Sequence, residues 1–534
     1  MNRLLIGQAL LAGLLWGSFL AWIGIHTTGD SVAYFRAALD LAENGSMNMN
    51  PIWPPLYPVL LGGMTALTGL PTEAAVVLSG TLLAVLLFAT GWVVTQATRD
   101  NVLATVVLLF CCCWWEMLYI FKVAWSEQLF AALVALHLVA IIRHCQTGAL
   151  RDFAMAAATA SLVVLSRYIG YSIMGIFLVY SVIWVVRNGE WRRHLMVFSA
   201  SVSPLVGWLL FNLYRTSTLH GERTPTDLTT LDNLQMTISV FRDQLWSTPM
   251  LTALLFSASV AAVVVIWRGQ GWIRTVLMYV WAYLLGYTAL LIYAASTVQM
   301  DVINPRFLSP LLPTVLIVIA LPVGGLAELI PKSRFMIQRV VFSLLLVGLL
   351  GGMRSWQAGM LSLVSGVNTV AFHGAAGFSA SQTAVELNAM FAKKLAENPQ
   401  LAVGLLTSEK NGSKASVMVM RRAVLEGNGL TKANFTEVSK RSISISLMLD
   451  GQEREMLAWS PRLMNNVEDV RRALQEASQS TGESELLVIT RRKVLRRTGV
   501  PDADLSSLSH YRCQPEPVIE PYLIYTCSTA SASR

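Results

Sequence analysis

The sequence predicts a polytopic α-helical membrane protein of about eleven transmembrane helices, with a small exterior α/β domain at its C-terminal end. Hydrophobic residues make up 54% of the chain, charged residues only 13%, and the mean hydropathy is +0.53. A soluble globular protein carries about 25% charged residues. Long apolar runs fill residues 1–360, whereas residues 370–534 have the mixed composition of a water-soluble domain. We therefore expect lipid to surround most of residues 1–360.

The apolar runs are long and uniform, which favours helices over the alternating strands of a membrane barrel. The run Leu4–Ile25 has the length of a bilayer span and no convincing small-residue cleavage site, so we interpret it as a retained helix and not as a signal peptide. The segment 56–69 is short and follows prolines, which predicts an interfacial position. The expected spans are 4–25, 73–97, 102–119, 127–142, 153–166, 170–186, 195–212, 250–267, 275–294, 307–328 and 339–353.

The loops between these spans alternate in charge. Arginine and lysine gather in one set, and the acidic residues of the other set lie in the long loops 26–55 and 213–249 and at Asp301. The positive-inside rule makes the basic loops cytoplasmic. We expect a cytoplasmic N-terminus, an exterior C-terminal domain and the bacterial inner (plasma) membrane. The net charge of +8 is spread over short loops and is not packed into a basic stripe with interleaved aromatic residues. This favours membrane orientation and contact with anionic headgroups, and it argues against nucleic acid as a partner.

The chain therefore divides into a membrane module, residues 1–360 with a first exterior loop at 26–72, and an exterior domain, residues 370–534. Strand-like runs such as "ELLVITRR" alternate there with helical patterns such as "NVEDVRRALQEAS", which indicates a small α/β layer. Cys513 and Cys527 lie in this domain. They could form a disulfide if the domain is outside the cytoplasm, and the sequence leaves their pairing open.

Ionisable residues recur on the exterior side, at the ends of the apolar runs. Ionisable groups at membrane depth are costly and usually face a cavity. Carboxylates with several cations suit a reaction at an anionic headgroup, because the cations hold a phosphate and a carboxylate deprotonates a nucleophile. The residues are Asp30, Arg36, Lys122, Glu127, Arg167, Tyr168, Arg223 and Arg306.

Each of these residues also has a purely structural interpretation. Asp30 is a good helix N-cap in "TGDSVAYF", alone or together with a role as base. Arg167 and Arg306 fit basic side chains that extend to the membrane surface. Glu127 at a helix start complements the helix dipole. Lys122 fits a solvated charge at a helix end. These residues all lie on the expected exterior side of the membrane, and they follow one another in a characteristic order. Together these two observations favour a functional site.

The order of the motifs resembles the GT-C membrane glycosyltransferases, specifically the branch with protein O-mannosyltransferases and bacterial lipid A aminoarabinose transferases. The likeness covers about residues 1–320. Its motifs are "D-x-x-x-Y-x-x-A" at Asp30, Tyr34 and Ala37, then "PPLYPVLLG", Ser126–Glu127, Leu165–Ser166–Arg167, Asn212 with Gly221 and Arg223, and Arg306 to Pro313. Many relatives carry a second acidic residue directly after the first, where this chain has Ser31, so Glu127 would be the second carboxylate.

This resemblance implies a polyprenyl-phosphate-linked sugar donor and transfer on the exterior face with inversion at the anomeric carbon. Asp30 would be the base, with Glu127 as the second catalytic carboxylate. No cofactor is expected, although a divalent metal stays open. The acceptor could be a lipid, a glycan or a protein. The implied donor-phosphate ligands are Arg167, Arg306, Lys122 and Arg223, and the implied substrate-binding residues are Tyr34, Arg36 and Tyr168.

Three other functions compete with this one. A transporter or flippase of a lipid-linked substrate would show repeated halves and broken helices near the midplane, and the halves here do not resemble each other. An assembly or receptor protein would use the exterior domain and need far fewer spans as an anchor. A glycan ligase or polymerase would act on a diphosphate carrier and release polyprenyl diphosphate, whereas transfer from a monosaccharide carrier releases polyprenyl phosphate.

Overall fold

The computed structural model describes most of residues 3–330, parts of 336–345, and strand segments between 402 and 529. The gaps before residue 330 are 24, 26–28, 47–50, 222, 224, 227, 246–248, 270, 299 and 301–302. The chain splits into two compact units, whose main parts are Met1–Leu361 and Ala375–Arg534.

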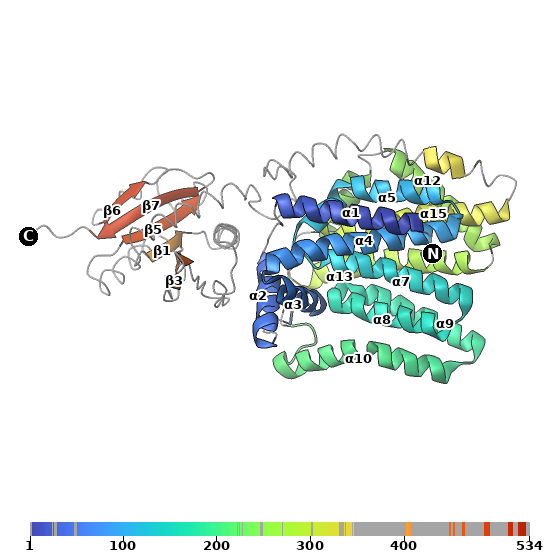
Figure 1. Ribbon diagram of the computed structural model, residues 1–534, viewed down its shortest axis with the longest axis horizontal. Helices are drawn as coiled ribbons and strands as arrows, with labels where there is room; N and C mark the ends of the chain where they lie inside the picture. The colour runs from blue at the N-terminus through green and yellow to red at the C-terminus, as the bar shows by residue number, and fades with distance from the viewer. Residues whose placement is uncertain are drawn as a thin grey trace, which may run out of the picture. The chain divides into compact units, whose positions relative to one another are not determined.

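The first unit is a bundle of helices, most of which run roughly parallel to one long direction (Figure 1). The helices α2 and α3 lie at one end of this bundle. Two 3₁₀ turns, η1 (Tyr168–Gly170) and η2 (Ser309–Leu311), precede α9 and α15. The helices are α1 (Arg3–Ile23), α2 (Gly29–Asn44), α3 (Leu56–Thr68), α4 (Pro71–Thr98), α5 (Asn101–Cys113), α6 (Trp115–Lys122), α7 (Glu127–Thr147), α8 (Leu150–Ser166), α9 (Tyr171–Asn188), α10 (Trp191–Thr216), α11 (Thr230–Leu245), α12 (Pro249–Arg268), α13 (Trp272–Thr297), α14 (Pro305–Leu308) and α15 (Leu312–Leu329).

Seven helical segments of the described residues are long and apolar enough to cross a membrane, or eight if the bent pair α5–α6 forms one span. The first unit is thus the membrane-embedded part of an integral membrane protein. The expected span 102–119 corresponds to this bent pair and is not one straight helix, because the chain turns by 63° between α5 and α6. Trp114 separates them in an extended conformation. The expected span 339–353 lies largely outside the described residues.

Helix α4 is central to the bundle, where it packs against α1, α3, α5, α7 and α15. It approaches α1 closely because glycines face each other. A Cβ atom added to Gly13 would lie 2.5 Å from the carbonyl oxygen of Gly80, and one added to Gly80 would lie 2.7 Å from the carbonyl oxygen of Gly13. Small residues permit such close packing of apolar helices in lipid, where apolar burial supplies little driving force.

The polar loop that follows the first span, residues 26–72, folds in its described parts into α2 and α3, which pack against each other. Gly62 of α3 faces Leu41 and the backbone of Ala38 in α2. Helix α3 then continues into α4 through a left-handed residue, Gly69, with φ of 86°. The polar stretch after the first span is therefore an ordered helical pair that carries Asp30 in the first turn of α2.

The second unit contains a five-stranded sheet of order β4-β1-β5-β7-β6 and a short two-stranded sheet. β1 pairs in parallel with β4 and β5, whereas β7 pairs antiparallel with β5 and β6. The helices expected between these strands lie outside the described residues, so the α/β layer stays a prediction. The strands are β1 (Ala402–Leu406), β2 (Met448–Leu449), β3 (Gln452–Glu453), β4 (Arg462–Met464), β5 (Glu485–Arg491), β6 (Tyr511–Pro515) and β7 (Tyr522–Thr529).

Candidate active site

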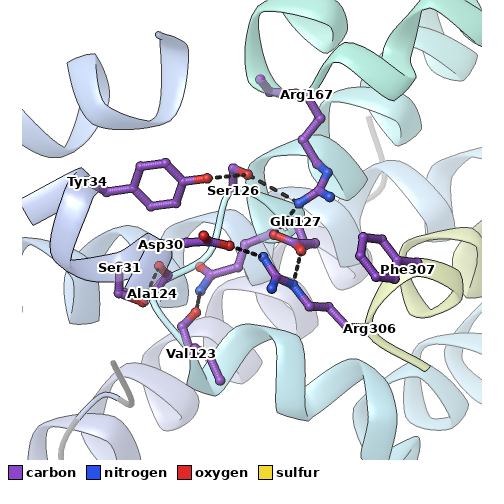
Figure 2. Close-up of polar contacts among 12 residues, drawn as sticks. Asp30, Ser31, Tyr34, Val123, Ala124, Ser126, Glu127, Arg167, Arg306 and Phe307 are labelled. Carbon is purple, nitrogen blue, oxygen red and sulfur yellow. Dashed lines mark hydrogen bonds and ion pairs between the residues drawn. The ribbon is translucent and has the colours of Figure 1, made fainter. Parts of the chain in front are cut away.

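Four charged side chains from distant parts of the sequence meet in one cluster, which we call the charge cluster: Asp30, Glu127, Arg167 and Arg306 (Figure 2). Arg306 donates from its Nη2 to Oδ2 of Asp30 at 2.7 Å and from its Nε to Oε1 of Glu127. Arg167 forms an ion pair with the other oxygen of Glu127 at 2.5 Å. Two carboxylates thus face two guanidinium groups, and their formal charges balance.

The two carboxylates differ in their access to solvent. The side chain of Glu127 is 1% exposed, whereas that of Asp30 is 31% exposed. Glu127 bridges both arginines, and a buried carboxylate is stable only with such partners. Asp30 contacts Arg306 from the rim of the cluster. Asp30 is therefore the carboxylate that an incoming molecule can reach, and Glu127 holds the arginines in place.

Arg306 is fixed on several sides. Its guanidinium carbon lies 3.9 Å from the centroid of the Trp125 ring, a cation–π contact. Asn304 caps the short helix α14 by accepting a hydrogen bond from the backbone N–H of Arg306 at 2.9 Å. Because both the backbone and the side chain are held, the guanidinium is preorganised between the two carboxylates.

Tyr34 joins α2 to the start of α7. Its hydroxyl lies 3.3 Å from Oγ of Ser126, and Oγ of Ser31 donates to the carbonyl of Ala124 at 2.9 Å. Burial and the negative charges of Asp30 and Glu127 raise the pKa of Tyr34 above its ordinary value. Its phenol stays neutral at physiological pH and can form hydrogen bonds without adding charge.

A second group of polar residues lies beside the charge cluster: Tyr168, His220 and Arg223, which we call the loop clasp. It joins the loop between α2 and α3 to the loop after α10. The hydroxyl of Tyr168 donates to the carbonyl of Pro51 at 2.8 Å, and Arg223 donates to the carbonyl of Ile52 at 3.0 Å. A Cβ atom added to Gly221 would lie 2.6 Å from the backbone nitrogen of Ile52, so this contact requires glycine. The loop clasp thus holds the backbone at Pro51 and Ile52 against a segment that is distant in the sequence.

His220 completes the loop clasp. Its Nε2 lies 2.9 Å from the hydroxyl of Tyr171, and its ring packs edge-on against Tyr168 with centroids 4.8 Å apart. Burial and the charge of Arg223 lower the pKa of His220 below its ordinary value. The ring is therefore neutral at pH 7, which allows Nε2 to accept from Tyr171 when the proton lies on Nδ1.

The structure separates the expected site residues into groups. It brings Asp30, Tyr34, Glu127, Arg167 and Arg306 together, and it places Tyr168 and Arg223 in the loop clasp. The interpretation of Arg306 as a basic side chain that extends to the membrane surface is wrong, because this residue is only 8% exposed. Lys122 ends α6 and is buried, so a solvated end charge is wrong as well. Arg36 lies in α2, and its side chain is outside the described part of the structure.

Two residues that hold the cluster were not predicted as ligands or partners: Trp125 beneath Arg306, and Asn304 at the start of α14. Trp125 stands directly before the Ser126–Glu127 motif, and Asn304 stands directly before the proline that starts a helix, which is a recognisable capping pattern. Within the described residues, no group of three or more His, Cys, Asp or Glu side chains is placed to hold a metal ion.

No protein-family model and no curated protein sequence matches the chain. Two solved structures match nearly all of it. ArnT from Cupriavidus metallidurans bound to undecaprenyl phosphate aligns with a TM-score of 0.56 and 11% sequence identity, over 98% of this chain and 97% of that one. The apo structure of ArnT from the same organism aligns with a TM-score of 0.55 and 11% identity, over 96% and 97%.

The chain has a GT-C-type fold. The predicted resemblance to GT-C membrane glycosyltransferases is thus confirmed at the level of fold. The arabinosyltransferase EmbB from Mycobacterium smegmatis is a more distant likeness, with a TM-score of 0.42 and 13% identity over 61% of this chain and 30% of that one.

Proposed function

We propose that this protein is an inverting glycosyltransferase that moves a sugar from a polyprenyl-phosphate-linked donor to an acceptor on the exterior membrane face. The observation that carries the proposal is the charge cluster, in which a partly exposed aspartate and a buried glutamate share one arginine. A base and phosphate-binding cations are the two components that such a transfer needs. Here they are in direct contact.

In the proposed step, an acceptor hydroxyl attacks the anomeric carbon of the sugar while its proton passes to the carboxylate of Asp30. The bond between the anomeric carbon and the phosphate oxygen breaks, and polyprenyl phosphate leaves with the electron pair. Attack from the face opposite the leaving group inverts the anomeric configuration. A sugar hydroxyl is a poor nucleophile at neutral pH, so a positioned base accelerates the step by about 10²–10⁴-fold.

Arg167 and Arg306 are the proposed phosphate ligands. Their guanidinium groups both contact Glu127, which keeps them close to each other and leaves part of the Arg167 side chain, 18%, exposed. Guanidinium groups match phosphate oxygens bidentately and stabilise charge that develops on a leaving phosphate. The similar structure of ArnT contains undecaprenyl phosphate, which supports a lipid-linked donor for this chain.

The loop clasp suits a supporting role in this reaction. Tyr168 follows Arg167 directly in the sequence, and its hydroxyl binds the backbone at Pro51. Half-buried Trp53, two residues further on, packs edge-on against Tyr34 with ring centroids 6.3 Å apart. We propose that the clasp holds an aromatic wall beside Asp30 and orients the sugar.

The proposed topology has eleven spans, a cytoplasmic N-terminus and a periplasmic C-terminal domain in the bacterial inner membrane. The basic loops support this orientation. Asp30 then lies on the exterior side, where the lipid carrier and the acceptor meet. The roles of Lys122 and Arg36 as substrate ligands stay predictions.

The proposal is tested by the release of polyprenyl phosphate from a radiolabelled lipid-linked sugar by purified wild-type protein and the Asp30→Asn variant. Asparagine preserves the shape and the hydrogen bond from Arg306 but cannot accept the proton. We expect a folded variant with turnover reduced about 100-fold or more. The matched control is Asp40→Asn, the same change about three turns further along α2, which should keep wild-type turnover.

The other outcomes separate the alternatives. Wild-type turnover in folded Asp30→Asn would contradict the assignment of the base and direct attention to Glu127. Release of polyprenyl diphosphate would indicate a ligase or polymerase. If wild-type protein turns over none of a panel of donors but moves them across a vesicle bilayer, the protein is a transporter and the enzyme proposal is wrong.

A further inference from the structure

The C-terminal hairpin brings two cysteines opposite each other. In the antiparallel ladder between β6 and β7, Cys513 is the direct partner of Cys527. The ladder runs from the pair Tyr511–Thr529 to the pair Pro515–Tyr525, so the cysteine pair is its central pair. Fraying at either end of the ladder leaves this pair in place.

The backbone geometry of such a pair fits a disulfide. Directly opposite residues of antiparallel strands have Cα atoms about 4.5 Å apart in a non-hydrogen-bonded pair and about 5.5 Å apart in a hydrogen-bonded one. A disulfide needs a Cα separation of about 4.4–6.8 Å. Both kinds of pair fall in this range. Opposite positions also share one face of the sheet, because the side-chain period of a strand is two.

A bond between these residues would anchor an edge strand of the sheet. Strand β6 is an edge strand, since it pairs with β7 and is last in the order of the sheet. β7 is held on its other side by β5 through a ladder from Glu485–Ser528 to Arg491–Tyr522. A covalent link at the centre of the β6–β7 ladder would attach the edge strand to the interior of the sheet.

We propose that Cys513 and Cys527 form a structural disulfide in the mature protein. The remaining cysteines, Cys111, Cys112, Cys113 and Cys145, are free thiols on α5 and α7. In the proposed reaction, both thiols are oxidised by thiol–disulfide exchange with a disulfide-bearing protein oxidant of the exterior compartment. One S–S bond forms, the oxidant's S–S bond breaks, and the two protons and two electrons leave on the two thiols of the reduced oxidant. The bond does not depend on the proposed glycosyl transfer.

The test is made on the full chain in its native membrane. Cells are treated with N-ethylmaleimide before lysis, and the purified protein is digested with and without reduction and analysed by mass spectrometry. We expect a linked peptide that contains Cys513 and Cys527, and labelling of both cysteines only after reduction. Cys513→Ser should release Cys527 for labelling, whereas Cys145→Ser, the matched control, should leave the linked peptide unchanged.

A second measurement tests the pairing of the two cysteines independently of the compartment in which the domain lies. Purified protein is reduced and then equilibrated with mixtures of reduced and oxidised glutathione. Because the β6–β7 register pairs Cys513 with Cys527, we expect the same disulfide-linked peptide to form in oxidised mixtures. Thiols that stay open there would overturn the pairing itself. Thiols that close in glutathione but carry N-ethylmaleimide from the cell would overturn a bond in the mature protein and with it the exterior position of the domain.

Discussion

Replacing Glu127 with glutamine removes the shared partner of both arginines and preserves the shape of the side chain. Glu127 is 1% exposed and contacts one arginine through each of its oxygens. Breaking a buried ion pair from one side costs about 3–5 kcal/mol, because the opposite charge is left without a counterion. The glutamine oxygen retains one acceptor, which recovers about 1 kcal/mol. We therefore expect Glu127→Gln to lose about 2–4 kcal/mol of stability.

The matched comparison is Asp30→Asn. The Asp30 side chain is 31% exposed and shares Arg306, so the loss of its charge should cost at most about 1 kcal/mol. Thermal unfolding in a constant detergent should rank the midpoints as wild type, Asp30→Asn and then Glu127→Gln. A protein of this size need not unfold in two states, so the ranking of midpoints is the observable.

The double variant Glu127→Gln with Arg167→Gln completes the test. It removes the cation that Glu127→Gln leaves without a counterion, so it should unfold at a higher temperature than Glu127→Gln alone. The coupling between the two positions should be at least about 1 kcal/mol. A Glu127→Gln variant as stable as wild type, with no coupling to Arg167, would refute the buried bridging role.

Three further predictions concern the charge cluster and the loop clasp. Arg306→Lys replaces a planar group that contacts two carboxylates, so kcat/KM should fall about 100-fold; Arg151→Lys, at a side chain that is 76% exposed, should change it less than twofold. Tyr168→Phe removes a hydroxyl that makes three hydrogen bonds and should cost about 1–3 kcal/mol; a similar loss in Tyr214→Phe, a position 92% exposed, would contradict the clasp. The lowered pKa of His220 means that the folded state binds fewer protons than the unfolded state. The stability that neutral His220 contributes is therefore complete above about pH 6.5, and it is lost as the pH falls through the lowered pKa. Unfolding midpoints between pH 7.5 and 5 should fall more steeply in wild type than in His220→Gln, and equal slopes would refute it.

The members of the charge cluster could be predicted because ionisable residues are rare in this chain. Each one stands out at the end of an apolar run, and a carboxylate or guanidinium at membrane depth needs a reason. Their pairing could not be predicted. Asp30 and Arg306 are separated by most of the membrane module, and nothing local in the sequence indicates that one arginine reaches both Asp30 and Glu127.

The helices show the same limit. Apolar runs located most of them, because lipid requires every backbone group to be paired within the helix. The turn at Trp114 was missed, since "FCCCWWEM" is apolar at its start and contains neither proline nor glycine. Trp125 was missed as a partner of Arg306 for a related reason. Aromatic residues are common at the ends of membrane helices, and only the folded chain shows which one stacks against a cation.

The shared arginine connects the two halves of the proposed chemistry. Without substrate, the two guanidinium groups neutralise the two carboxylates, so the charge cluster carries no net charge. A donor phosphate adds negative charge, and it has to take donors from one of the carboxylates. Glu127 is buried and bound on both oxygens, whereas Asp30 is partly exposed and bound to Arg306 alone among the cluster arginines. Asp30 is therefore the carboxylate that yields. Under the proposed mechanism, binding of the donor releases the base from Arg306, and the carboxylate becomes available for the acceptor hydroxyl only when the phosphate is in place.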